Sequence, residues 1–163
     1  QKDIVILSRN SSFCKIPEIK FGSMPNDGGF LIISYEEKED ILLKEQDLEK
    51  YIKPLIGAEE FLNNQKRYCF WLVDISPQEI KKSKILFERL ENVKKHRLSS
   101  KRSSTNKLAA YPYLFGEIRQ PKNDFLLIPY VSSEKRIYIP LGFFNSNNIC
   151  GTKVIKIAMP AIK

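Results

Sequence analysis

The segment from Lys94 to Lys107 carries side chains that could contact a nucleic acid. It contains six basic residues and no acidic one, and Ser, Thr and Asn side chains stand between the charges. Lysine and arginine bind phosphate oxygens, while arginine, serine and asparagine also form hydrogen bonds with the edges of bases. The segment therefore predicts a surface for DNA or RNA, although its composition alone fits a flexible basic loop equally well.

The net charge of the chain is concentrated around the same segment. Residues 81–107 hold ten Lys and Arg against two Glu, which equals the whole net charge of +8, and the rest of the chain is balanced at 17 basic and 17 acidic residues. One basic stretch in a neutral domain is the pattern expected for a protein with a polyanionic partner. In the helical part of the stretch, the pairs Lys84–Glu88 and Glu91–Lys95 compensate each other, which is typical of a solvated helix face.

The chain offers little material for a catalytic or metal site. His96 is the only histidine, and the three cysteines stand far apart without a Cys-x-x-Cys pair, which argues against a zinc site and a disulfide framework. No glycine-rich phosphate motif links a strand to a helix. Asp124 and Glu134-x-Arg136 faintly resemble the acidic residues of metal-dependent nucleases, so a metal nuclease stays as an alternative. We expect no catalytic residue and no cofactor in this chain.

Length and composition indicate one globular domain. The chain has 163 residues, of which 42% are hydrophobic, an ordinary share for a folded protein. No apolar run approaches the roughly 18 residues of a membrane span. The strand-like start at Gln1 and the abrupt end at Lys163 suggest a piece of a longer protein. Unpaired cysteines, among which Cys69 is expected to be a small core residue, suggest a reducing cytoplasm.

Capping patterns place the helices. The Asp27-Gly28-Gly29 turn precedes a short buried strand at residues 30–34, and a capping box at Ser34 opens a helix that runs to Leu43. A second helix is predicted at residues 47–51, ended by Pro54. A further capping box at Ser76 starts a long helix, whose apolar face is formed by Ile80, Ser83, Leu86, Phe87, Leu90 and Val93.

Strand patterns complete the predicted fold. Residues 67–73 are apolar on both faces, which predicts a central strand. The last third of the chain shows strand patterns at residues 115–119, 125–131, 137–140 and 153–157, separated by turns. Helices in the middle and consecutive strands afterwards favour an α+β fold with a mixed or antiparallel sheet, a long central helix and flanking short helices.

Several motifs, in order along nearly the whole chain, resemble one protein family. They are the runs Pro54–Phe61, Lys66–Leu72, Phe115–Pro121 and Ser132–Pro140, together with Asp27-Gly28-Gly29, Arg97-x-x-Ser100 and Thr105-x-x-Leu108-Ala109. This combination resembles the target-recognition domain of MmeI-like enzymes, which are single-chain restriction–modification proteins. The resemblance implies that residues 1–163 form one DNA target-recognition domain, with residues 1–54 as a sub-region that packs toward a methyltransferase domain.

The resemblance also implies a longer parent enzyme in a bacterial cytoplasm, with double-stranded DNA as its partner. Its nuclease domain would cleave unmodified DNA with Mg²⁺. Its methyltransferase domain, upstream of this chain, would transfer a methyl group from S-adenosylmethionine to the exocyclic amino group of adenine. The chain contains neither the Asn-Pro-Pro-Tyr type catalytic motif nor the glycine-bearing cofactor motif of such enzymes, so enzymatic activity is assigned to the parent alone.

Within this resemblance, the side-chain types suggest roles for individual residues. Lys94, Lys95 and Lys107 are expected to bind phosphates. Base edges are expected to be read by Arg97, Lys101, Arg102, Ser104 and Asn106, with Glu117, Arg119, Glu134 and Arg136, and Ser100 belongs to the same predicted DNA-binding set. For Glu117 and Glu134, an ion pair that positions the neighbouring arginine is an equally good interpretation.

Two further function classes stay open at this point. A general nucleic-acid-binding module, such as an RNA-binding domain, would be supported by a contiguous aromatic stacking platform, which the sequence does not show. A purely structural protein–protein module would show no salt-dependent binding to DNA.

Overall fold

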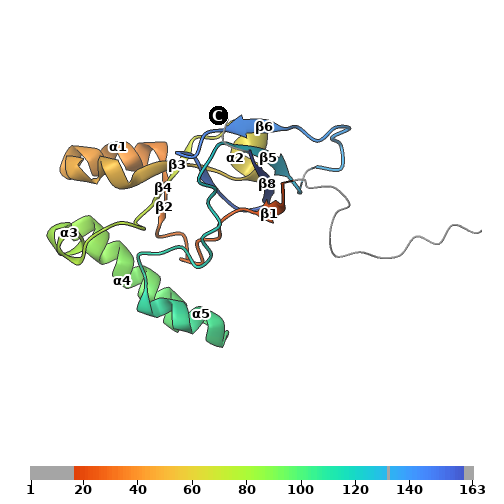
Figure 1. Cartoon of the computed structure of the whole chain (residues 1–163). Helices are drawn as coiled ribbons and strands as arrows, with labels where there is room; N and C mark the ends of the chain where they lie inside the picture. The colour runs from red at the N-terminus through yellow and green to blue at the C-terminus, as the bar shows by residue number, and fades with distance from the viewer. Residues whose placement is uncertain (1–16, 132, 160–163) are drawn as a thin grey trace, which may run out of the picture.

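The fold combines two small sheets with a group of helices. The computed structural model describes residues 17–131 and 133–159. Each sheet has four strands. Most of the helices lie on the side of the molecule away from the sheet that contains the last strand of the chain (Figure 1). The predicted α+β class is confirmed, with one mixed and one antiparallel sheet in place of a single sheet.

The first sheet has the strand order β2-β4-β3-β7. Its strands are β2 (Ile32–Ser34), β4 (Arg67–Phe70), β3 (Ile52–Ile56) and β7 (Ile149–Cys150). β4 pairs antiparallel with β2 and β3, which confirms the predicted central strand, although it ends at Phe70. Pro54 does not end a helix as predicted, because it lies within β3. Proline is tolerated at this position of β3 because β7 pairs only with Leu55 and Ile56. The edge of β3 that faces away from β4 is therefore unpaired at Pro54.

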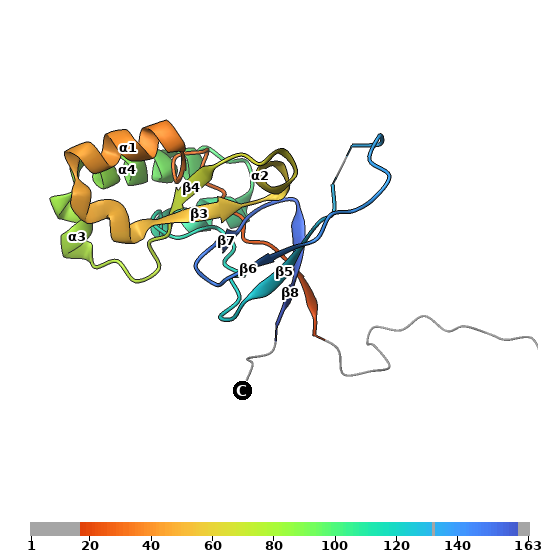
Figure 2. The same ribbon diagram turned by 90° about the horizontal axis from the view of Figure 1, so that it is seen from above.

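The second sheet has the order β1-β8-β5-β6 and is antiparallel. Its strands are β1 (Ile19–Phe21), β8 (Val154–Ala158), β5 (Phe125–Pro129) and β6 (Gly142–Phe144). β5 and β8 confirm two predicted strands. The strands predicted at residues 115–119 and 137–140 are wrong. Glu117 forms only an isolated bridge with Met24, and residues 137–140 belong to a segment that extends away from the sheet, where they have no strand to pair with (Figure 2).

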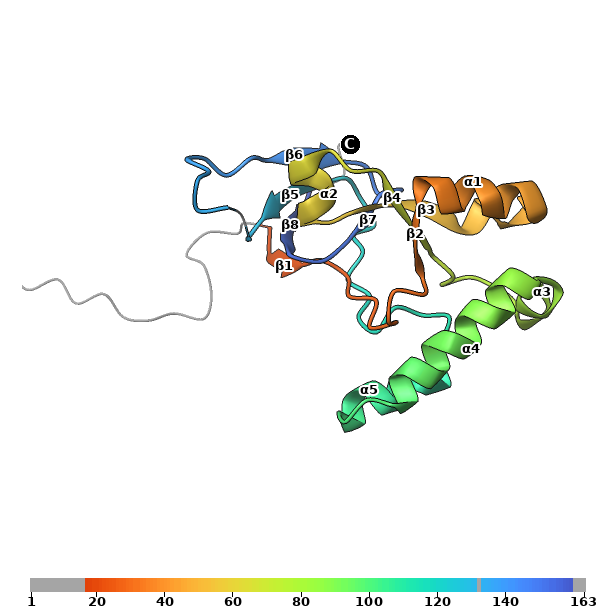
Figure 3. The ribbon, with the colours of Figure 1, turned by 180° about the vertical axis from the view of Figure 1, so that it is seen from behind.

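The helices follow the strands in two groups. α1 (Tyr35–Lys44) and the 3-10 helix η1 (Gln46–Tyr51) come after β2, and α2 (Ala58–Asn63) comes after β3. α3 (Pro77–Lys82), α4 (Lys84–Leu98), α5 (Ser103–Lys107) and the 3-10 helix η2 (Leu108–Ala110) form a helical arm (Figure 3). The capping box predicted at Ser76 is confirmed, because Ser76 Oγ accepts from Glu79 N at 3.3 Å and Ser76 N donates to Glu79 Oε2 at 3.1 Å. At Ser34 only the serine cap forms: its Oγ accepts from Glu37 N at 3.1 Å, while the Glu37 carboxylate pairs with Arg89.

The single long helix predicted from Ser76 is wrong, because the chain forms two helices that meet at Ser83. Ser83 Oγ accepts a hydrogen bond of 3.0 Å from Leu86 N and so caps α4. Ile85 N donates to Glu45 Oε1, which lies 40 residues earlier, at 3.2 Å. These partners satisfy N–H groups at the start of α4 that have no partner within the helix. Phe87, predicted on the apolar face, is 53% exposed.

Two apolar clusters stabilise the fold. The larger one joins the first sheet to α1 and α4, and the smaller one joins β5 and β8 to α2. Cys69 is fully buried in the larger cluster, which confirms its predicted place in the core. Burial raises the pKa of the Cys69 thiol and raises the pKa of the Cys150 thiol to about 11. Cys14 lies outside the described residues.

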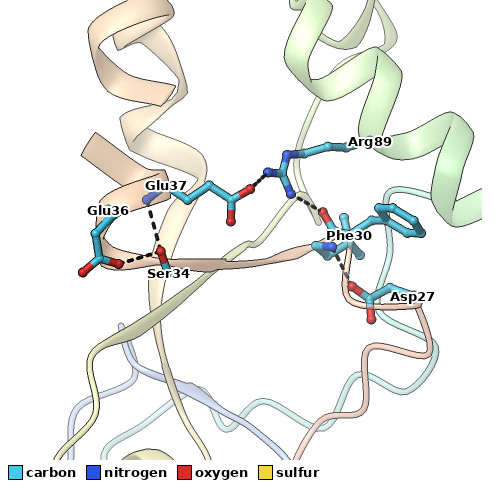
Figure 4. Close-up of polar contacts among 7 residues, drawn as sticks. Asp27, Phe30, Ser34, Glu36, Glu37 and Arg89 are labelled. Carbon is cyan, nitrogen blue, oxygen red and sulfur yellow. Dashed lines mark hydrogen bonds and ion pairs between the residues drawn. The ribbon is translucent and has the colours of Figure 1, made fainter. Parts of the chain in front are cut away.

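The Asp27-Gly28-Gly29 turn requires both of its glycines. Their φ angles are +70° and +91°, in the left-handed region. Asp27 Oδ2 accepts a hydrogen bond of 2.6 Å from Leu31 N, which closes the turn onto the start of the next strand (Figure 4). A β-carbon on Gly28 would lie 2.8 Å from Cγ of His96, whereas one on Gly29 would meet nothing within 4 Å.

We expect Gly28→Ala to destabilise the domain more than Gly29→Ala. Both changes place alanine in the left-handed region, at a cost of roughly 1–2 kcal/mol, but only the first adds an overlap with His96. Urea denaturation measures the difference in the free energy of unfolding. Adding His96→Ala to Gly28→Ala should bring its stability close to that of Gly29→Ala. Equal values for the two single variants would show that the His96 ring moves aside without cost.

Candidate nucleic-acid interface

The basic segment Lys94–Lys107 covers the end of α4, the turn after it and α5. Among its predicted contact residues, Ser100 and Asn106 are half-buried, and the exposed ones are Lys94, Lys95, Lys101, Arg102, Ser104 and Lys107. The structure therefore brings most of the predicted contact residues to one end of the helical arm (Figure 3).

Local hydrogen bonds give this segment a defined conformation. Asn106 Nδ2 donates to the carbonyl oxygen of Leu98 at 2.9 Å, which joins α5 to the end of α4. The backbone N–H of Arg102 donates to Ser100 Oγ at 3.2 Å, in the turn between the two helices. These contacts favour a structured surface over the alternative of a flexible basic loop. They also engage part of the Asn106 amide, whose oxygen is left for another partner.

Arg97 is not available for a base contact, and that part of the prediction is wrong. The residue is fully buried. Its guanidinium donates five hydrogen bonds of 2.7–2.9 Å, all to backbone carbonyl oxygens, which belong to Pro25, Asn26, Leu108, Tyr111 and Leu114. Because a guanidinium has five N–H groups, none is left for DNA.

The position of Arg97 explains how the basic segment is held. Its partners lie in two stretches, the turn at residues 25–26 and the chain at residues 108–114, so one side chain joins both to the end of α4. α5 lies between these anchored points and is positioned by them. Burial lowers the pKa of Arg97, and the nearby Asp27 carboxylate acts in the opposite direction. The guanidinium still stays charged at neutral pH, because its ordinary pKa is above about 12.

Arg89 fixes the other side of α4. Its Nη1 donates to the carbonyl oxygen of Phe30 at 2.8 Å, and its Nη2 forms an ion pair with Glu37 of α1 (Figure 4). α4 is therefore tied to the turn that precedes β2 and to α1, the helix that follows this strand. Contacts from both arginines set the direction in which the helical arm presents its basic end.

Glu117 and Arg119 form the ion pair that the sequence allowed as an alternative to base contacts. Arg119 is further tied to the fold, because its Nη1 donates to the carbonyl oxygen of Gly22 at 3.1 Å and its backbone N–H donates to Ser23 Oγ at 3.0 Å. Both side chains are only partly exposed. This pair lies on the chain between η2 and β5.

Glu134 and Arg136 lie in the segment between β5 and β6 that extends from the second sheet (Figure 2). Glu134 is exposed and Arg136 is half-buried. Arg136 N donates to the carbonyl oxygen of Ser133 at 3.0 Å, which forms a tight turn. Within the described part of the chain, no ion pair between Glu134 and Arg136 occurs. Their predicted base contacts stay a prediction.

The residues suggested for a metal nuclease do not form a cluster. Asp124 precedes β5 and Glu134 follows it, so the whole strand lies between them. Across residues 17–131 and 133–159, no group of three or more His, Cys, Asp or Glu side chains is placed to hold a metal ion. Within the same residues, no helix is long and apolar enough to cross a membrane.

Comparison with known proteins identifies the family. The family described as "MmeI, target recognition domain" matches residues 1–162. The chain belongs to this family. It is 34% identical to the Type IIL restriction–modification enzyme MmeI, whose structure was solved in complex with DNA, with a TM-score of 0.89 over 99% of this chain and 21% of that one. It is also 38% identical over 148 residues to DNA methyltransferase A of Bacillus subtilis (strain 168), covering 91% of this chain and 17% of the relative.

Membership in the MmeI target recognition domain family confirms the predicted family, the α+β fold and the role in DNA target recognition. The chain spans about a fifth of the length of each of these two relatives. The role of Arg97 was missed, although the sequence held a signal for it. Leu86, Leu90, Val93 and Arg97 follow one another at steps of four, three and four residues, so Arg97 continues the buried stripe of the helix.

Proposed function

We propose that this chain is the DNA-reading domain of a longer enzyme that methylates adenine within a specific sequence and cleaves DNA that lacks the modification. The observation that carries the proposal is the match of 99% of the chain, at a TM-score of 0.89, to an enzyme solved in complex with DNA. The exposed basic end of the helical arm supports it independently, because cationic side chains on one surface suit a phosphate backbone.

A separate reading domain has a clear physical use in such an enzyme. A methyltransferase must turn its adenine out of the base stack, which costs a few kcal/mol. Contacts between this domain and the surrounding duplex offset that cost and determine which adenine is presented. The methyl donor S-adenosylmethionine and Mg²⁺ belong to other domains of the parent, because the chain carries no motif for either. The contact of residues 1–54 with the methyltransferase domain and the bacterial cytoplasm as location belong to the same proposal.

The exposed residues divide into two groups by the chemistry of their side chains. Lys94, Lys95 and Lys107 bind phosphates and position the domain. Lys101, Arg102, Ser104 and Asn106, with Glu134 and Arg136, read base edges, while Ser100 holds the turn before α5 by accepting from Arg102 N. Glu117 and Arg119 keep their ion pair and contribute to recognition by holding the chain beside Ser23.

A domain exchange tests the function directly. In the parent enzyme, this domain is replaced by the matching part of the Bacillus relative, and the methylated positions in cellular DNA are sequenced. We expect the methylated sequence to follow the domain, while the modified base stays adenine. An unchanged methylated sequence would show that recognition lies elsewhere in the parent.

Replacing Lys94, Lys95 and Lys107 together by Ala is expected to weaken binding of the domain to all DNA sequences alike. If about four phosphates are contacted, the slope of log K against log salt is about −3.6 in the wild type, and each lost contact reduces it by about 0.9. Fluorescence titration at several salt concentrations measures the slope. The matched control replaces Lys44, Lys66 and Lys122, which are exposed lysines outside the basic segment. Equal slopes for the two triple variants would contradict the phosphate assignment.

A further inference from the structure

One face of the second sheet is apolar and open to solvent. The strand register places its side chains in two rows, Ile19, Ile157, Leu126 and Phe143 in the first and Phe21, Ile155 and Ile128 in the second. All seven are exposed or half-buried. Ile19, Phe21 and Phe143 are 58%, 56% and 73% exposed. We call these seven residues the open face.

The other face of the same sheet is packed at its centre, although Lys20 and Ala158 on it are exposed. Phe125, Leu127 and Val154 are completely buried in the cluster that includes α2. Lys156, on the same side, is also buried and donates from Nζ to the carbonyl oxygen of Phe21 at 2.6 Å. An antiparallel sheet that covers one face with its own domain normally presents polar side chains on the other. The open face departs from this pattern, because its solvent-exposed side chains are apolar.

The open face does not have the chemistry of a DNA contact. Neither row contains a charged or hydrogen-bonding side chain. Contacts with a phosphate backbone are made by side chains of these two kinds. Tyr130 extends the apolar surface, because its ring packs edge-on against Phe21 with the centroids 5.6 Å apart. A contiguous apolar patch drawn from all four strands of a sheet is typical of a protein–protein contact.

We propose that the open face is the docking surface for another domain of the same polypeptide, which meets it with an apolar surface of its own. This inference rests on the proposed place of the chain in a longer enzyme. The chain spans only 17% and 21% of the two relatives, so most of such a polypeptide lies outside this domain.

The connectivity of the sheet supports this partner over an independent protein. β1 and β8 are the first and last strands that the structure describes, and they are neighbours. Between them they contribute four of the seven residues of the open face. The described chain therefore begins and ends close to the two strands that carry most of the open face. A domain tethered there has a high effective concentration at this surface.

Photocrosslinking in the full-length parent tests the docking surface. A photoreactive benzoylphenylalanine replaces Phe143 in one variant and Phe87 in the control. Both positions are exposed phenylalanines, but Phe87 lies on α4, away from the open face. After irradiation we expect the residue at position 143 to be joined to a peptide from outside residues 1–163, in a product of monomer mass. The control should give little of this product. The methylated DNA sequence is recorded for both variants.

Three results would overturn the inference. A product of dimer mass would show that a second copy covers the open face. A crosslink within residues 1–163 would show that the chain covers its own sheet. Equally low yields at positions 143 and 87 would show that the face stays uncovered. If the parent still methylates its sequence in any of these cases, the proposed docking surface is wrong but the proposed function is not contradicted. The crosslinking and methylation results therefore test the two proposals separately.

Discussion

Replacing Arg97 by Ala is expected to lower the free energy of unfolding by about 3 kcal/mol or more, because several buried carbonyl oxygens lose their hydrogen-bond donor at once. The change removes five hydrogen bonds from a fully buried guanidinium and leaves carbonyl oxygens of two chain segments without their donor. An unpaired buried polar group costs about 1–3 kcal/mol. Even if water reaches some of these carbonyl oxygens, the loss of unfolding free energy is therefore large. Urea denaturation measures it.

Two further variants distinguish the loss of these contacts from the loss of charge. Arg97→Lys keeps the positive charge, but a single ammonium with three donors cannot reach all five carbonyls, so it should recover only part of the stability. Arg102→Ala removes an exposed arginine of the same segment and should change stability by no more than about 0.5 kcal/mol. A stable Arg97→Ala variant with weakened DNA binding would restore the direct contact predicted from the sequence.

Single replacements at the proposed base-reading positions are expected to change the methylated sequence of the parent. The positions are Lys101, Arg102, Glu134 and Arg136. A bidentate base contact discriminates by about 1–3 kcal/mol, or roughly tenfold to a hundredfold. Exchanging such a residue for one of opposite hydrogen-bonding character, for example Arg136→Glu, should therefore alter the preferred base at one position of the site. Sequencing of methylated DNA after expression of each variant measures the change.

The rate of methylation separates recognition from catalysis in the same experiment. Because the proposed catalytic residues lie in another domain, a variant should methylate its new site at a rate close to that of the wild type on the old one. Lys44→Glu, on the exposed surface of α1, serves as a control that reverses a charge without changing the site. If all four replacements left the methylated sequence unchanged in folded enzyme, base reading would have to come from other residues.

Interactions within a few residues were predicted well from the sequence. The caps at Ser34 and Ser76 each involve a hydrogen bond to a backbone N–H three residues later, so their formation needs no distant partner. In the strand at Arg67–Phe70, the adjacent residues Cys69 and Phe70 are both fully buried, as expected of a strand that is central in its sheet. Most lysines and arginines of the basic segment are exposed as expected, because exposure is the ordinary state of these side chains.

Distant contacts account for the errors. Residues 137–139 have the β-branched and aromatic side chains typical of strands but no neighbouring strand, and Ile137 is 97% exposed. Ser83 could lie inside a helix or cap one, and the choice depends on Glu45, which accepts from Ile85 N across 40 residues. The pairing of β7 with β3 likewise brings together segments that are far apart in the sequence.

The sequence by itself therefore determined the family, the caps, the central strand and the place of the positive charge, because these follow from side-chain types and short spacings. The helix spacing placed Arg97 on the buried stripe of α4, but only the tertiary structure supplied the partners with which a charged side chain is buried there. Arg97 and Arg102 are the same residue type, five positions apart. One is buried because carbonyl oxygens from two distant segments surround it, and the other is exposed because no such segment lies beside it. The positions of these carbonyl oxygens depend on how the backbone folds, so they cannot be read from the side-chain types near Arg97.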